Sequence, residues 1–240
     1  MWYSLIYQNI GVFILPKKTL NSSELYQLIL KLCEEFWREL LRIDAWIWHE
    51  HLKNGHCRVC KSKRLRRHRY CRKPRGLPES MSKEIIEALQ WRNSSRCKDC
   101  GAQNTPASVV FLGRKVYVGV MVILATRLLL DAKHPIQKYS LFGEQASLLT
   151  VMRWQYWWHY AVAKNAFWKQ NQGRLQISTK IAHLITKAWN HFQQQCVALT
   201  NTAQAILIFF SPITIPQQYP THPRLSVGQL KQRGWDDEFF

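Results

Sequence analysis

Two pairs of cysteines have the residue type and the spacing that metal binding requires. Cys57 and Cys60 form one Cys-x-x-Cys motif, and Cys97 and Cys100 form a second, which Gly101 follows directly. A turn with this spacing directs two thiolates at one ion, and two such turns supply four soft ligands in the closed tetrahedral geometry of a structural zinc site. We therefore expect these four cysteines to bind a structural Zn²⁺.

The stretch between the two motifs leaves the ligand set open. It is 36 residues long, whereas common ribbon spacing is about 15 to 20. That length indicates a ribbon with an inserted hairpin or helix, and residues 80–91 suit either. His68 and Cys71 lie in the insertion and could replace a ligand. A thioredoxin-like redox pair is the rival interpretation, but such a motif should open a helix after a strand, and neither pair does so.

Basic residues crowd the first cysteine pair. The chain carries 34 Lys and Arg against 15 Asp and Glu, and eleven of the basic residues lie between Lys53 and Arg75 with no acid among them. Such a run opposes compact folding, and phosphate contacts would relieve the repulsion through counterion release. A solvated face without a partner is the plain alternative. We expect contacts with the DNA backbone from Arg58, Lys61, Lys63, Arg64, Arg66, Arg67, Arg69, Arg72, Lys73 and Arg75.

A second candidate for DNA contact is the segment SLLTVMRWQYWWHYAV, residues 147–162. Its apolar residues would pack inward on a helix and leave Thr150, Arg153 and Gln155 nearer the exposed side, as in a recognition helix. Residues 138–146 would then supply the first helix and the turn, although this linker is shorter than usual. A core helix anchored by its tryptophans is the alternative, and both can hold because a recognition helix buries one face.

Signs of catalysis are weaker. A two-metal nuclease or transposase needs carboxylates that converge on the ions. The candidates are scattered along the chain: Asp44, Glu50, Asp99, Asp131 and Glu144. The stretch WHEHLKNGH, residues 48–56, holds three histidines beside a glutamate but lacks the HExxH spacing. A protein without its own chemistry is therefore favoured over an enzyme.

The elements that must position these residues can be outlined from apolar spacing. Helices are predicted through residues 22–40, 177–192 and 198–210, and the apolar segment 107–131 predicts a short strand followed by a buried helix. The run at 116–126 is too short to span a bilayer, which takes about 20 residues. The expected fold class is mainly α with a small β zinc ribbon, followed by a helical, helix-turn-helix-like domain. The expected division is an N-terminal helical segment (1–54), a zinc ribbon with a basic insertion (55–106), the helical domain (107–210) and a Pro-rich extended tail (211–240).

The order of motifs resembles a known group of proteins. A CxxC pair and a basic insertion precede RCKDCG and FLGRKVYVGVMVILA, and LTVMRWQYWW, AFW and LIFFSPIT follow. This order is similar to zinc-ribbon, helix-turn-helix proteins carried by bacterial transposons and other mobile elements, over roughly residues 55–213. The resemblance implies zinc at the four cysteines and DNA binding by the helix at 147–160, and it implies no reaction.

The leading hypothesis is a sequence- or structure-specific DNA-binding protein of a mobile genetic element. It would recognise element ends or target DNA and recruit a transposase or recombinase, in the cytoplasm and associated with the nucleoid. Neither a secretory signal nor a membrane partner is expected, so the cysteines are interpreted as those of a reducing compartment. Two alternatives stay open: a small metal-dependent transposase or nuclease, and an RNA-binding subunit of a ribonucleoprotein.

Overall fold

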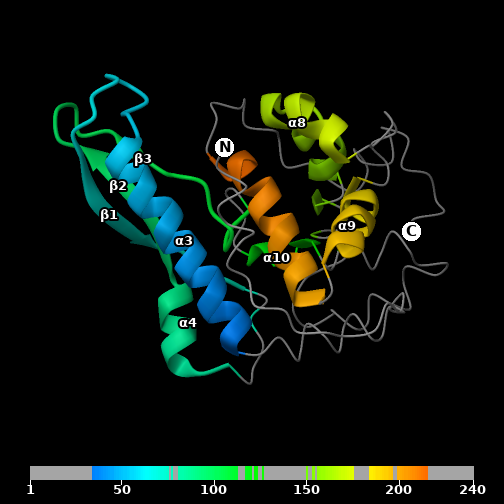
Figure 1. Cartoon of the computed structure of the whole chain (residues 1–240). Coiled ribbons are helices and arrows are strands. Elements are labelled where there is room, and N and C mark those ends of the chain that lie inside the picture. The colour runs from blue at the N-terminus through cyan, green and yellow to red at the C-terminus, as the bar shows by residue number, and fades with distance from the viewer. Residues whose placement is uncertain are drawn as a thin grey trace.

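A computed structural model describes residues 34–75, 77, 81–112, 117–120, 122–123, 126, 150, 153–154, 156–175, 184–196 and 199–215. Helices make up most of these parts, and a small antiparallel sheet lies at one side (Figure 1). A mainly α fold with a small β portion is thus confirmed. The start of the N-terminal helix, the first helix of the expected helix-turn-helix and the tail beyond residue 215 lie outside the described residues.

Helix α3 (Glu34–Asn54) connects the sheet to the rest of the protein. Phe36, Trp37, Leu40, Ile43 and Trp48 are buried along it, at the spacing that gathers apolar side chains on one side of a helix. Its first turns pack on helix α4 (Lys83–Leu89), and its later turns pack on the sheet (Figure 1).

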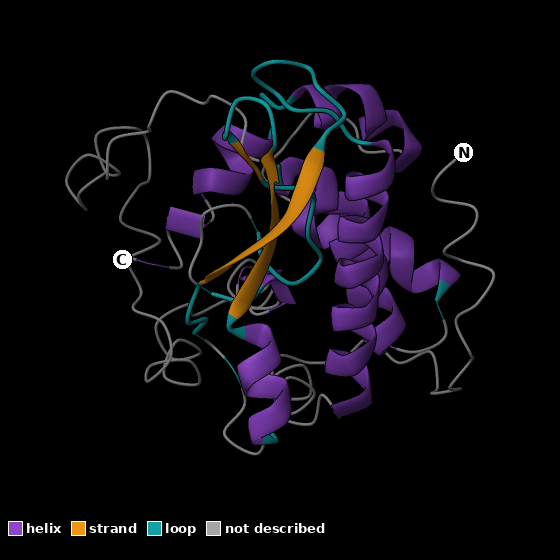
Figure 2. Cartoon of the chain, turned by 90° about the vertical axis from the view of Figure 1, so that its left-hand side faces the viewer, coloured by secondary structure: helices purple, strands orange, loops and turns teal. Residues whose placement is uncertain are grey.

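The sheet has the order β1-β2-β3, with strands β1 (Leu65–Cys71), β2 (Trp91–Cys97) and β3 (Gln103–Asn104). The first two pair antiparallel over their whole length, from Leu65 opposite Cys97 to Cys71 opposite Trp91. The connection between them contains α4, so the insertion between the cysteine pairs holds a helix. Strand β1 lies at the edge of the sheet, and Figure 2 shows the long helix α3 running beside the sheet.

The remaining helices form a body around α10 (Leu199–Phe210), which is buried along most of its length. Its last six residues, 205–210, are all apolar, so this part is buried on every side. Around it lie the π-helix η1 (Trp157–Val162), α8 (Ala166–Asn171), the 3-10 helix η2 (Gln172–Leu175) and α9 (Leu184–Gln195). Within the described ranges, no helix combines the length and apolarity needed to cross a membrane.

Two segments differ from the secondary structure that the sequence predicts. Residues 109–112 are buried but form a single bridge, Phe111 with Val118, where a short strand is expected. The helical positions described after that bridge, 119–120, 122–123 and 126, agree with the expected buried helix. The expected extended tail begins as a packed 3-10 helix, η4 (Ser211–Thr214), because Ile213 and Thr214 are buried against the body.

Candidate metal centre

The four cysteines of the two motifs meet at one point, although 36 residues separate the pairs. Their sulfur atoms all lie within 4.8 Å of one another, with 3.5 Å between Cys57 and Cys100 and 3.5 Å between Cys60 and Cys97. Zinc–sulfur bonds of about 2.3 Å in a tetrahedron would place the sulfurs about 3.8 Å apart, whereas a disulfide needs about 2.05 Å. Cys57, Cys60, Cys97 and Cys100 could therefore hold a metal ion.

Each cysteine pair is carried by a turn with the same backbone hydrogen bonds. In both turns, the amide four residues after the first cysteine donates to that cysteine's carbonyl, and the cysteine's own amide donates to the carbonyl five residues on. The distances are 2.9 and 2.8 Å in the turn of Cys57, and 3.1 and 2.9 Å in the turn of Cys97. The residue after each pair is left-handed, with φ of 62° at Lys61 and 72° at Gly101. The two turns are therefore near copies of one another.

These turns favour one thiolate in each pair. The backbone amide of Cys60 is the main cause that lowers the pKa of Cys57 to about 6, and the amide of Cys100 likewise lowers the pKa of Cys97. At Cys60 the amide of Ser62 also favours the thiolate, but the neighbouring sulfurs of Cys100 and Cys97 outweigh it and raise the pKa to about 12. Four neighbouring sulfurs cannot all ionise without a cation between them, and a divalent ion would supply that charge.

Asn104 of β3 forms hydrogen bonds to both cysteine turns. Its position in the sequence does not predict this role. Its side chain is fully buried. The amide nitrogen donates to Cys57 Sγ at 3.7 Å and to the carbonyl of Ala102 at 3.0 Å, and the amide oxygen accepts from the backbone of Arg58 at 2.9 Å. One side chain thus ties the two turns together, as outer-shell groups do at metal sites.

His68 and Cys71 are not part of this group of ligand atoms. Both lie on β1, which leads away from the cysteine cluster. Cys71 is six residues beyond Leu65, which corresponds to roughly 20 Å of extended chain, and it lies opposite Trp91 at the far end of the sheet. The strand therefore carries both residues away from the cysteine cluster.

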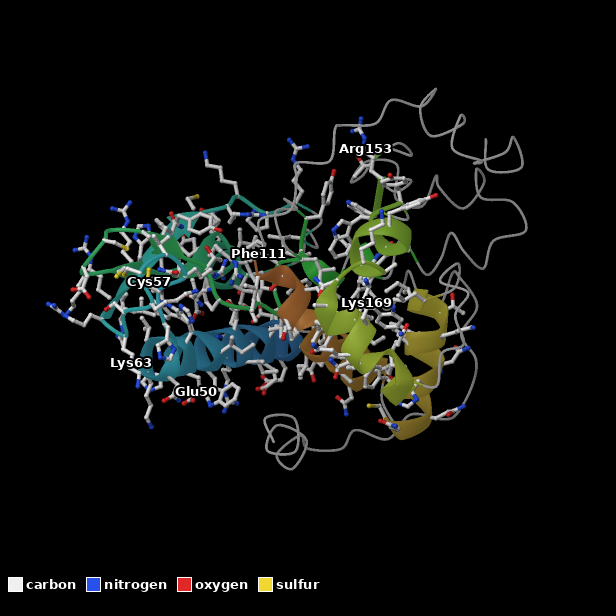
Figure 3. All side chains as sticks on the ribbon, turned by 90° about the horizontal axis from the view of Figure 1, so that it is seen from above. Glu50, Cys57, Lys63, Phe111, Arg153 and Lys169 are labelled. Carbon is white, nitrogen blue, oxygen red and sulfur yellow. The ribbon has the colours of Figure 1, made fainter. Side chains whose placement is uncertain are left out.

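Most of the expected DNA-backbone residues lie near the first cysteine turn and along β1, whereas Arg72, Lys73 and Arg75 follow the end of that strand. All of them are exposed except Arg72, which is half-buried with its guanidinium 5.4 Å from the centre of the Phe111 ring. Exposed Arg96 of β2 lies directly opposite Arg66, and exposed Lys98 follows in the second turn. Figure 3 shows side-chain nitrogens gathered around Cys57 and Lys63. We call the following set the basic surface: Arg58, Lys61, Lys63, Arg64, Arg66, Arg67, Arg69, Arg96 and Lys98.

Asp99 is the one carboxylate in the two cysteine turns, and it is paired. It forms an ion pair with Arg64 at 2.8 Å and accepts a hydrogen bond from Ser62. Among the described residues, no ion pair to a carboxylate is formed by Arg66, Arg67, Arg69 or Arg96.

The second DNA-binding candidate is described only in part. Thr150 is half-buried in a helical position, Arg153 is exposed, and Gln155 lies outside the described residues. Trp154 and Trp158 are buried in the core, as the alternative of a core helix predicts. Figure 3 places Arg153 over the helical body, away from Cys57. The structure thus does not bring this segment together with the basic surface.

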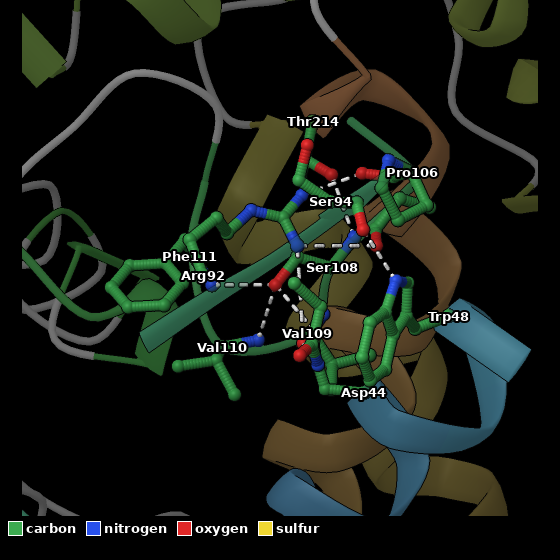
Figure 4. A network of polar contacts seen from close by, with 12 residues as sticks. Asp44, Trp48, Arg92, Ser94, Pro106, Ser108, Val109, Val110, Phe111 and Thr214 are labelled. Carbon is green, nitrogen blue, oxygen red and sulfur yellow. Dashed lines mark hydrogen bonds and ion pairs between the residues drawn. The ribbon is translucent and has the colours of Figure 1, made fainter. Parts of the chain in front are cut away.

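The carboxylates considered for catalysis serve the fold where they are described. Asp44 is buried, and its Oδ1 accepts from Ser108 Oγ and from the amide of Val109, the latter at 3.1 Å. Its Oδ2 accepts from Asn93 at 3.0 Å and lies 3.8 Å from the buried guanidinium of Arg92 (Figure 4). Burial is the main cause that lowers the pKa of this arginine. Asp44 is therefore enclosed rather than open to a substrate.

The other acidic and histidine candidates do not form a site in the part of the chain that is described. Glu50 accepts a hydrogen bond from Asn54, and His49, His51 and His56 belong to no cluster of ligand atoms. His51 instead contacts Ser95 Oγ at 3.0 Å. Asp131 and Glu144 lie outside the described residues.

The candidate site is thus one cluster of four thiols surrounded by basic side chains. Comparison with protein-family models, curated proteins and solved structures returned no match for this chain.

Proposed function

We propose that the chain binds zinc at Cys57, Cys60, Cys97 and Cys100 and uses the basic surface around this zinc ribbon to bind DNA. The single observation that carries the proposal is the coincidence of two features. The two cysteine turns and the sheet meet at a four-thiol cluster. Beside it stand Arg66, Arg67, Arg69 and Arg96, which form no ion pair with a carboxylate in the described part of the chain.

Zinc fits the donor set. Four cysteines in a closed tetrahedral arrangement are typical of structural zinc sites, and iron is the other ion that such sulfurs accept. A small sheet with little core of its own can take folding energy from the metal. The ion and four thiolates would together carry a charge of −2.

The charge that remains favours a polyanionic partner. From Cys57 to Cys100 the chain has fourteen Lys and Arg and four Asp and Glu. The −2 charge of a zinc–thiolate centre offsets only a small part of this excess. Arg66 and Arg96 lie directly opposite each other on the sheet, and like charges in that position destabilise it. Phosphates placed there would remove this repulsion and release counterions.

A narrower role follows from the resemblance described above. As a protein of a mobile element, the chain would recognise element ends or target DNA and recruit a transposase or recombinase. Thr150, Arg153 and Gln155 would add contacts beyond the phosphate backbone, which positions a protein without specifying sequence.

Binding to duplex DNA over a range of salt concentrations tests the proposal. Removal of one phosphate-binding charge should reduce the slope of log K against log salt by about 0.9. We expect tight binding at low salt that weakens steeply as salt rises, and a shallower slope for the double variant Arg66→Gln/Arg96→Gln. Lys169→Gln, an exposed residue of α8, is the matched control. A DNA affinity that does not change with salt concentration, or no binding to any duplex, would refute DNA binding. A preference for structured RNA over duplex DNA would favour the ribonucleoprotein alternative.

The metal is tested by elemental analysis of the purified protein. One zinc per chain is expected in the wild type and in Cys71→Ser, because Cys71 lies at the far end of β1. Cys97→Ser should lose the metal. Iron in place of zinc would correct the identity of the ion, and loss of metal from Cys71→Ser would contradict the ligand set.

A further inference from the structure

Trp48 lies between α3 and the sheet in a fixed orientation. The residue is 8% exposed, and its Nε1 donates to the carbonyl of Ser94 at 2.6 Å. The indole plane therefore cannot turn without breaking a buried hydrogen bond.

Two arginines of β1 lie over this ring. The guanidinium carbon of Arg69 is 4.8 Å from the ring centre, and that of Arg67 is 5.7 Å away. Both distances fall within the range of a cation–π interaction. Arg69 is held further, because its Nε donates to Asn93 Oδ1 at 3.1 Å, and Asn93 in turn donates to the buried Asp44 at 3.0 Å.

These two positive charges are held close together. Arg67 and Arg69 are two residues apart on the same face of an extended strand, a separation of about 6.7 Å along the chain. Both side chains are exposed, and in the described ranges neither forms an ion pair with a carboxylate. Their repulsion would be relieved by anions at a similar spacing, which successive phosphates of a nucleic-acid strand provide.

A covering role for the two side chains is the alternative. Arginine stems shield apolar surface, and charges on an edge strand discourage pairing with another chain. Lysine would serve both purposes equally well. A planar guanidinium is required only where stacking on the ring fixes the charge in place.

We propose that Trp48 is a positioning residue that holds Arg67 and Arg69 as a preformed clamp for two successive phosphates of a DNA backbone running along the edge of β1. This clamp rests on the proposed function, since it concerns the same basic surface. It adds that the geometry of the arginines, beyond their charge, contributes to affinity.

Charge-preserving variants test the clamp with a random-sequence DNA duplex as the probe and zinc-loaded full-length protein. Arg67→Lys/Arg69→Lys keeps both charges but removes the stacked geometry. We expect affinity to fall roughly fivefold or more, because two stacking interactions are removed, with the salt slope unchanged. Arg42→Lys is the matched control, because this exposed arginine of α3 lies outside the basic surface, and it should bind like the wild type.

A second pair of variants separates positioning from folding. Trp48→Phe keeps an aromatic ring beneath the arginines but loses the hydrogen bond to Ser94, whereas Trp48→Leu loses both. We expect both variants to be less stable in thermal unfolding, and only Trp48→Leu to lose affinity comparable to the double lysine variant.

The outcomes separate this inference from the function on which it rests. Wild-type affinity in Arg67→Lys/Arg69→Lys, or equal affinity losses in Trp48→Phe and Trp48→Leu, would overturn the clamp while salt-dependent DNA binding stands. If the wild type binds no duplex at any salt concentration, the proposed function fails and the clamp fails with it.

Discussion

At the scale of single residues, the four thiols around the metal position are not equivalent. Cys57, with its pKa lowered to about 6 by backbone amides, is largely a thiolate at neutral pH, whereas Cys60, with its pKa raised to about 12 by the sulfurs beside it, is a thiol. Only a thiolate binds zinc. If the cluster binds zinc as proposed, binding would release a proton from Cys60 under ordinary conditions.

Zinc affinity should consequently rise with pH. Each proton released contributes about a tenfold gain in apparent affinity per pH unit. Below about pH 6 Cys57 is also protonated in the metal-free protein, so the dependence should become steeper as pH falls through that value. Competition with a chromophoric chelator at a series of pH values measures this slope. An affinity that does not change with pH would contradict the assignment of Cys60 as a ligand.

His51 adds a second pH effect, on the fold itself. Burial, and then the charge of Arg58, lowers the pKa of this histidine below its ordinary value of 6.5. The unfolded chain therefore binds this proton at a higher pH than the folded chain does. The stabilisation from neutral His51 is complete above about pH 6.5, and it is lost as the pH falls through the lower pKa of the folded state. In urea unfolding with zinc present, His51→Gln should show a weaker loss of stability between neutral and acidic pH than the wild type. If His51→Gln loses as much stability as the wild type over this pH range, other groups cause the acid sensitivity.

At the scale of elements, α3 is the part that aligns the sheet with the helical body. Three residues on successive turns of this helix contact three consecutive residues of β2: Asp44 with Asn93, Trp48 with Ser94 and His51 with Ser95. The same helix buries Phe36, Trp37 and Leu40 in the core shared with α10. A disturbance of α3 should therefore reach both parts of the protein.

Removal of Asp44 tests this connection. Asp44→Ala leaves the buried Arg92 without its carboxylate and leaves Asn93 and Ser108 without an acceptor. Breaking a buried ion pair from one side costs about 3 to 5 kcal/mol, and we expect a loss of that order in chemical denaturation. Glu39→Gln, which breaks the exposed pair with Arg42, should cost less than about 1 kcal/mol. Equal effects would mean that the network does not stabilise the fold.

The junction between α3 and the first cysteine turn depends on Gly55. A Cβ there would clash with the backbone carbonyl of His51 and lie 2.7 Å from its ring nitrogen Nδ1. Gly55→Ala should therefore destabilise the protein by about 1 to 3 kcal/mol, measured by denaturation of the zinc-loaded form. Gly173→Ala, where a Cβ meets nothing within 4 Å, is the control and should change little. An unchanged free energy of unfolding in Gly55→Ala would show that the backbone at this junction can move to accommodate the added methyl group.

Sequence reasoning identified the four-cysteine cluster because ligand spacing within a turn is a local property. The group of four cysteines was predicted, and it is the group that the structure brings together. The cation–π contacts of Arg67 and Arg69 with Trp48, and the enclosure of Asp44, depend on strand register and on the packing of α3. Both features join residues far apart in the chain. Local spacing carries no such information. The role of residues 147–162 in DNA recognition stays a prediction.

At the scale of the whole molecule, the metal should stabilise one end more than the other. The described hydrophobic core lies mainly among α3, α4 and the helical body, whereas the turns around the cysteines contribute few apolar side chains. Chelation of zinc should therefore release the sheet end and abolish DNA binding, while much of the helical circular dichroism remains. Re-addition of zinc should restore binding. Retained DNA affinity after complete metal removal would contradict the proposed dependence on the metal.

The near-identical turns also imply an order of assembly. Gly101 adopts its left-handed backbone without penalty, but the same conformation at Lys61 costs roughly 1 to 2 kcal/mol. The hydrogen bond from Lys61 Nζ to the carbonyl of Arg58, 3.2 Å long, offsets only part of that cost. When the whole unfolded chain refolds, the turn of Cys97 should thus form more readily and bind the proposed ion first, and the turn of Cys57 should follow. The charged turn would then be the last part to become ordered and the first to open when the ion is withdrawn.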